Sequence, residues 1–93
     1  GIGGATAEIV GQLLHQLSVN TQVLCVTHQA QVASQGDQHL QVSKVVDAEQ
    51  AATRITALDE DHRIEEIARM LGGVAITDNT MAHAREMVHQ RPH

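Results

Sequence analysis

His28 stands where an apolar segment gives way to polar residues, and it is the side chain best placed in this sequence to do chemistry. Residues 21–27 are rich in β-branched side chains and almost continuously apolar in the middle, which is typical of a strand buried on both faces of a parallel sheet. Open α/β sheets bind their ligands at the carboxyl ends of the strands. An imidazole at that edge can donate a hydrogen bond to a phosphate oxygen or orient a water molecule. The alternative is a histidine that ends the strand and contacts only solvent.

A second candidate is the Gly1-Ile2-Gly3-Gly4 segment, which precedes a predicted helix. The backbone amides at a helix N-terminus attract anions, so a glycine-rich approach to a helix can bind phosphate. The segment is neither a P-loop, which ends in Gly-Lys-Ser/Thr, nor the dinucleotide-binding fingerprint. A simple turn is therefore the alternative interpretation of these four residues.

Cys25 and His28 have a spacing that metal ligands also use, and the chain contains seven histidines. A structural zinc site needs four converging ligands, and the sequence has no second cysteine. We therefore predict that Cys25 is a small buried hydrophobic residue and that the chain binds no metal. The same interpretation gives no chemistry to the remaining helical candidates. Solvent-exposed helix faces are expected for Glu65, Glu66 and Glu86, and core or partner contacts for Met70, Met81 and Met87.

Composition excludes several classes of protein. The 93 residues carry a formal net charge of −5, so they offer no positively charged surface for DNA. They contain no Phe, Trp or Tyr, so they cannot stack on nucleic-acid bases. No apolar run is long enough to span a membrane, no secretory leader opens the sequence, and a single cysteine suits a reducing cytosol. Without aromatic residues the core must be shallow, which indicates a piece of a larger domain or a chain completed by a partner.

The elements that would position these candidates follow from periodicity and capping signals. A first helix capped by Thr6 and ending near Ser18 is predicted from an apolar stripe, and a buried strand over 21–27 follows it. The remaining predicted elements are a short helix over 29–34, an antiparallel hairpin of 37–46 with 52–58, a helix from an Asp59 cap to Gly72-Gly73, and a helix over 78–90 capped by Thr77. A buried parallel strand needs neighbours that this chain lacks, so we expect them upstream of Gly1.

Three stretches together resemble the RecN family, the bacterial DNA-repair ATPases of the SMC-like branch of the ABC superfamily. Residues 1–7, Gly-Ile-Gly-Gly-Ala-Thr-Ala, match the D-loop that follows the Walker B strand. Residues 22–33, Gln-Val-Leu-Cys-Val-Thr-His-Gln-Ala-Gln-Val-Ala, are similar to the switch strand and H-loop. Residues 63–73, Arg-Ile-Glu-Glu-Ile-Ala-Arg-Met-Leu-Gly-Gly, with Thr80, Ala84 and Glu86, look like the C-terminal helices of that family.

The resemblance implies an α/β fold, with residues 1–93 forming the C-terminal part of an ABC/SMC-type P-loop ATPase head. It implies ATP and Mg²⁺ as cofactors of the full-length protein, with His28 contacting the γ-phosphate and Gly1, Ile2, Gly3 and Gly4 crossing the interface between two heads. The P-loop, the Walker B carboxylates and the signature motif would lie upstream, so the fragment alone is expected to be inactive and to hold no cofactor.

The same resemblance implies the partners: the upstream half of the same head, a second head joined through ATP, and DNA bound by other parts of the protein, with no membrane contact. The expected location is the bacterial cytoplasm, at the nucleoid, in double-strand-break repair and recombination. Two alternatives stay open from the residues themselves. One is a free-standing, non-catalytic module that docks a partner through its apolar helices, and the other is a zinc-binding His/Cys protein.

Overall fold

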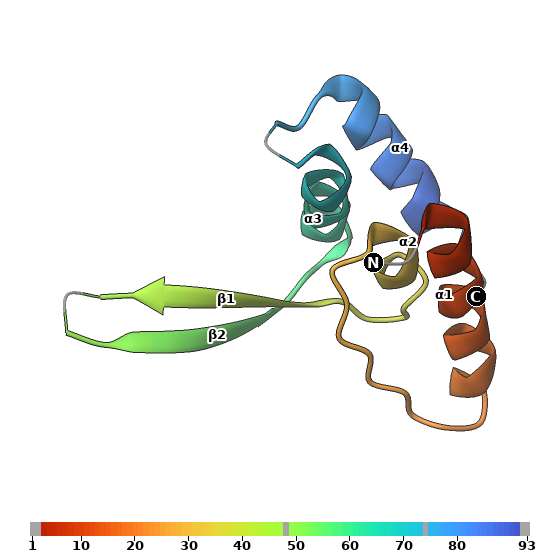
Figure 1. Ribbon diagram of the computed structural model, residues 1–93, viewed down its shortest axis with the longest axis horizontal. Coiled ribbons are helices and arrows are strands. Elements are labelled where there is room, and N and C mark those ends of the chain that lie inside the picture. The colour runs from red at the N-terminus through yellow and green to blue at the C-terminus, as the bar shows by residue number, and fades with distance from the viewer. Residues whose placement is uncertain (1–2, 48, 74, 92–93) are drawn as a thin grey trace.

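The computed structural model of the chain describes residues 3–47, 49–73 and 75–91 and shows a small α/β arrangement of four helices and one hairpin within those ranges (Figure 1). The elements in chain order are α1 (Gly4–Ser18), α2 (Ala30–Ala33), β1 (Leu40–Val46), β2 (Ala51–Ala57), α3 (Glu60–Gly72) and α4 (Asp78–His89). Helix α2 contacts both α1 and α3, and α3 packs on α4. No helix in the described ranges combines the length and the apolar character that a membrane span requires.

The predicted hairpin is confirmed. Strands β1 and β2 pair antiparallel from Leu40 opposite Ala57 to Val46 opposite Ala51, and the hairpin projects away from the helices (Figure 1). Side chains alternate across a strand, and here the polar residues Gln41 and Ser43 are the half-buried ones. The apolar face that carries Val42 and Ile55 is exposed instead.

The core lies between α2, α3 and α4, and it is as shallow as the composition predicts. Its fully enclosed part consists of small aliphatic side chains, and the predicted role of the methionines as filler is confirmed, because all three pack partly buried against it. The buried members of this cluster are Ala30, Ile64, Ile67, Ala68, Ala84 and Val88. Ile67 is the largest side chain that is completely enclosed.

Helices α3 and α4 begin and end where local signals predict. The Asp59 carboxylate accepts a hydrogen bond from the His62 amide at 2.8 Å and caps α3, whose first turn also carries acidic residues that suit the helix dipole. Gly73, with φ of 66°, ends the helix in a conformation that other residues rarely adopt. Thr77 and Thr80 form a reciprocal capping box that starts α4.

Two predictions in the N-terminal third are wrong. Residues 21–27 do not form the predicted buried strand: Thr21 lies in a bend, residues 22–27 have no regular secondary structure, and the exposed fractions of Leu24 and Val26 are 84% and 93%. A strand requires hydrogen-bonding neighbours, and the strands in the described residues pair only with each other. The apolar residues of this segment therefore have no neighbouring strand to pair with among the described residues.

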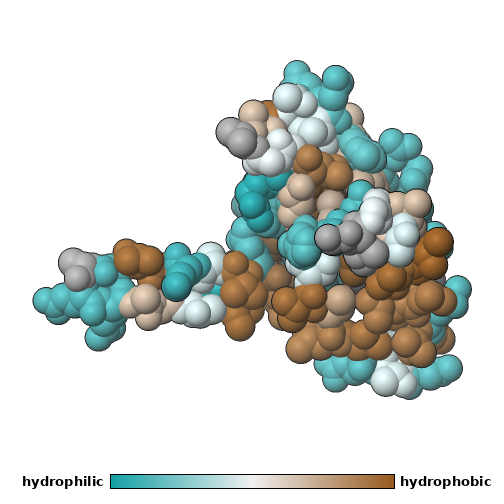
Figure 2. Space-filling model, viewed as in Figure 1, coloured by the Kyte–Doolittle hydropathy of each residue, from teal (hydrophilic) through white to brown (hydrophobic). Residues whose placement is uncertain are grey.

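Helix α1 also differs from its prediction at its start and on its apolar face. Gly3, not Thr6, is the N-cap residue, because helical geometry already begins at Gly4. The contact of α1 with the body is made through its small residues Ala7 and Gly11, which are buried. The predicted stripe is left largely in solvent, and Figure 2 shows hydrophobic side chains gathered over α1 and the extended segment that follows it. The exposed residues of the stripe are Ile9, Leu13 and Leu17, and those that follow α1 include Val19, Leu24 and Val26.

Candidate functional site

His28 lies at the junction between the extended segment and α2, with its side chain exposed to solvent. The preceding Thr27 hydroxyl accepts a hydrogen bond from the Gln29 amide at 2.9 Å, and Gln29 is the N-cap residue of α2. Among the described residues, no hydrogen bond or ion pair involves the imidazole of His28. Both ring nitrogens are therefore available to a ligand, one as a donor and one as an acceptor in the neutral form.

The glycine segment is described only in its second half, since Gly1 and Ile2 lie outside the described residues. Gly3 caps α1 and Gly4 is its first helical residue. A Cβ atom added to Gly4 would lie 3.3 Å from Nε2 of Gln31, so the start of α1 lies against α2. His28 and Gly4 thus both adjoin α2, although no hydrogen bond within the described ranges joins them.

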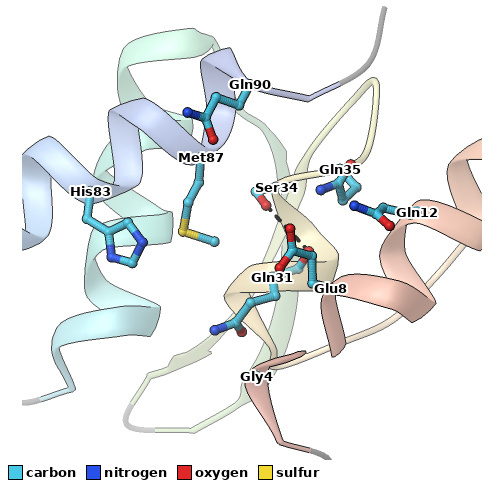
Figure 3. A pocket seen from close by; sticks show the side chains of 9 residues that line it. All are labelled: Gly4, Glu8, Gln12, Gln31, Ser34, Gln35, His83, Met87 and Gln90. Atoms are coloured by element: carbon cyan, nitrogen blue, oxygen red, sulfur yellow. Dashed lines mark hydrogen bonds between the residues drawn. The ribbon is translucent and has the colours of Figure 1, made fainter. Parts of the chain in front are cut away.

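A hollow of about 350 Å³ opens between the start of α1, the α2 region and α4 (Figure 3). Its walls are mainly polar, and the Ser34 hydroxyl points back to the Gln31 carbonyl at 3.5 Å. The sequence predicted none of its residues as functional except Gly4. The lining residues are Gly4, Glu8, Gln12, Gln31, Ser34, Gln35, His83, Met87 and Gln90.

Cys25 is exposed, so its predicted burial is wrong. The reason is the one that applies to the whole segment 22–27, which has no sheet around it to cover the thiol. In residues 3–47, 49–73 and 75–91, no three His, Cys, Asp or Glu side chains gather closely enough to hold a metal ion.

Glu66 is a second correction: it was expected on a solvated helix face, and it is only 8% exposed. Its carboxylate accepts hydrogen bonds from the Arg69 guanidinium and, at 2.7 Å, from Nε2 of Gln41 in β1. The Arg69 hydrogen bonds lower the pKa of Glu66, an effect that burial of the carboxylate opposes. Glu65 and Glu86 are exposed as predicted.

Arg63 is the polar residue that sequence reasoning missed. Its side chain is buried against α2, where Nη2 donates to three backbone carbonyls, those of Ala33, Ser34 and Gly36. A signal for it exists in the sequence, because Arg63 stands four residues before Ile67 and next to Ile64, on the stripe that α3 buries. A charge on an apolar stripe requires a specific set of acceptors.

No family model matches the chain, whereas several curated proteins do. Over 88 residues the chain is 49% identical to the DNA repair protein RecN of Vibrio cholerae and 47% identical to that of Haemophilus influenzae, in each case across 95% of its own length. It is 38% identical to the DNA repair protein RecN of Bacillus subtilis over 90 residues, or 97% of its length. The chain spans about 16% of the length of each of these relatives. The 93 residues therefore match the C-terminal region of RecN, a DNA repair protein.

Proposed function

We propose that this chain is part of the ATP-hydrolysing head of a RecN-type protein that acts in DNA double-strand-break repair and recombination, with His28 contacting the γ-phosphate. The observation that carries the proposal is the position of His28. It follows an apolar extended segment directly, it precedes a short helix, and its imidazole makes no hydrogen bond to any described residue. The similarity to DNA repair proteins called RecN over nearly the whole chain supports the same assignment.

The residues of this chain can supply one contact to a nucleotide, but they do not form a complete nucleotide-binding site. An exposed imidazole can donate an N–H to a phosphate oxygen, but the chain contains no P-loop. Bound ATP with Mg²⁺ would supply the phosphoryl group that is transferred to water. The remainder of the longer protein would contribute the groups that hold it, which accords with a chain spanning about 16% of its relatives' length.

His28 has a positioning and electrostatic role in this proposal. Phosphoryl transfer is catalysed mainly by placing groups and stabilising charge, so a donor held at the γ-phosphate favours the transition state in which negative charge spreads over the oxygens. The segment that begins α1, of which Gly3 and Gly4 are described, would lie at the contact between two heads. The start of α1 and His28 both adjoin α2, so a movement at the head interface can displace the residues next to His28.

The test is the His28→Ala variant of the full-length protein that contains this chain. Removing one preorganised donor typically costs about 2.7–4 kcal/mol, so turnover should fall by a factor of about 10²–10³ while ATP binding is largely kept. His89→Ala is the matched control, since His89 is an exposed histidine on α4 that does not line the hollow. Wild-type turnover in His28→Ala would contradict the role given to His28. The isolated 93-residue chain should not hydrolyse ATP, and saturable hydrolysis by it would contradict the proposal that the chain is an incomplete site.

A second function has its own support in the exposed apolar surface of α1 and the segment 22–27. Large exposed apolar patches are typical of protein–protein contact sites. A free-standing, non-catalytic interaction module would use that surface to dock a partner. Under this alternative the His28→Ala variant leaves ATP turnover in the full-length protein unchanged, whereas charged substitutions at Leu13 and Leu24 abolish partner binding.

A further inference from the structure

Arg63 is a buried cation in the apolar face of α3. Its exposed fraction is 4%, and it lies beside the core residues Ile64 and Ile67. Burial lowers the pKa of Arg63 to about 10, and the neighbouring Arg91 acts in the same direction, so the guanidinium remains charged at neutral pH. None of the ion pairs formed within the described ranges involves Arg63. Asp37 and Glu60 oppose this lowering of the pKa from a distance, but a buried charge that forms no direct ion pair is costly unless other polar groups satisfy it.

Backbone carbonyls at and just after the end of α2 satisfy one nitrogen of the guanidinium, whereas the buried Nε has no hydrogen-bond partner among the described residues. Nη2 of Arg63 donates to the oxygens of Ala33 at 3.0 Å, Ser34 at 3.3 Å and Gly36 at 2.5 Å. The last carbonyls of a helix have no partner within the helix and must be satisfied from outside it. Arg63 donates to these carbonyls although it lies about thirty residues further along the chain. In this way α3 fixes the C-terminal end of α2.

The opposite end of α2 adjoins His28. The helix has only four residues, and the carbonyl of its N-cap, Gln29, already accepts the amides of Val32 at 3.1 Å and Ala33 at 3.0 Å. The Ala33 residue therefore takes part in contacts at both ends, through its amide to Gln29 and through its carbonyl to Arg63. A displacement of the C-terminal carbonyls cannot be absorbed inside so short a helix.

We propose that Arg63 is a positioning residue for His28: by holding the C-terminal carbonyls of α2, it fixes the helix whose first turn sets the place of the imidazole. The inference rests on the proposed function only in the role that it gives to His28. The anchoring of α2 by Arg63 is a separate statement and can be tested without nucleotide.

The first experiment is amide hydrogen exchange on the full-length protein without nucleotide. Arg63→Met removes the three donated bonds and keeps most of the apolar stem. Losing such bonds should raise exchange in residues 29–36 by about 5- to 150-fold, with α4 unchanged. Arg63→Lys should restore part of the protection, because the lysine ammonium carries three N–H donors that can reach some of the same carbonyls. Arg85→Met, which alters an exposed arginine on α4, is the matched control and should change nothing in residues 29–36.

Two results of that experiment overturn the proposal. Unchanged exchange over 29–36 in Arg63→Met would show that the three hydrogen bonds do not hold α2. A uniform rise over α3 and α4 as well would assign Arg63 to general packing of the core. Protection lost in Arg63→Met and partly regained in Arg63→Lys supports the anchoring role.

The second experiment tests the route through His28 by measuring ATP turnover in single and double variants. Arg63→Met alone should lower the turnover number of the folded protein with little change in ATP binding. In a His28→Ala background the same substitution should have no further effect, because both changes remove the same contact. Multiplying effects in the double variant would overturn the link between Arg63 and His28. If His28→Ala alone leaves turnover at the wild-type level, the proposed function fails, while the exchange experiment still decides whether Arg63 anchors α2.

Discussion

Gly11 is where α1 comes close to the backbone of α2, and substituting it should push the two helices apart. A Cβ atom at this position would lie 2.9 Å from Cγ of Gln35, 3.0 Å from the carbonyl oxygen of Gln31 and 3.3 Å from Cα of Val32. Two of these three atoms belong to the backbone of α2 and its first turn, so they cannot rotate away as a side chain can. The helix α1 must move instead.

The magnitude follows from two opposing effects. Replacing a helical glycine by alanine favours folding by about 1 kcal/mol. Overpacking of a close contact costs about 1–3 kcal/mol. Gly4 provides the matched control in the same helix, because the nearest atoms to a Cβ there belong to the end of the flexible Gln31 side chain. Gly11→Ala should therefore be less stable than Gly4→Ala by about 1–3 kcal/mol, and Gly11→Val should lie at the upper end of that range.

Thermal unfolding of the 93-residue chain, followed by circular dichroism, is the appropriate assay. For a domain of this size each kcal/mol displaces Tm by about 4–8 °C, so the difference between the two alanine variants is readily measured. Equal Tm values for Gly4→Ala and Gly11→Ala, or a Gly11→Val variant as stable as the wild type, would refute the close contact between α1 and α2.

Two further predictions concern the joints on either side of α3. Glu66→Ala leaves Gln41 without its acceptor and should lower the free energy of unfolding by about 1–3 kcal/mol in denaturant titrations. Because the folded-state pKa of Glu66 lies below its ordinary value, its contribution is present above that ordinary value and is lost as the pH falls through the lowered one. In Glu66→Gln, the free energy of unfolding should therefore fall less steeply as the pH is lowered into the acidic range. An unchanged pH dependence would contradict the assignment. Gly73→Ala places a Cβ on a backbone with φ of 66° and ψ of −105°, and should lower stability by about 1–3 kcal/mol in the same titration, whereas a neutral effect would show that the helix end adjusts freely.

The elements that could be predicted from the sequence are those whose determinants are local. Asp59, Gly73 and Thr77 define the ends of α3 and α4 through contacts within one turn, and the alternation of residues 40–46 and 51–57 is enough to predict a hairpin. The strand predicted over 21–27 depends on partner strands elsewhere, and its apolar composition alone does not create them.

The candidate site divides in the same way. The prediction that His28 follows a strand at the edge of a sheet is wrong, because residues 21–27 form no strand, whereas its place just before a short helix is confirmed. The hydrogen-bond partners of Arg63 and Glu66 could not be predicted, because the acceptor at Gly36 and the donor at Gln41 lie 27 and 25 residues away. Such pairings depend on how α3 crosses α2 and β1, which no local pattern encodes.

The exposed thiol of Cys25 can report whether the apolar segment 22–27 is covered. It is the only cysteine among the 93 residues, and it lies between Leu24 and Val26, two of the most exposed aliphatic side chains in the described part of the chain. An alkylating reagent therefore modifies this chain at one known place. The speed of that modification measures how completely another surface, whether a neighbouring strand or a separate protein, encloses residues 22–27.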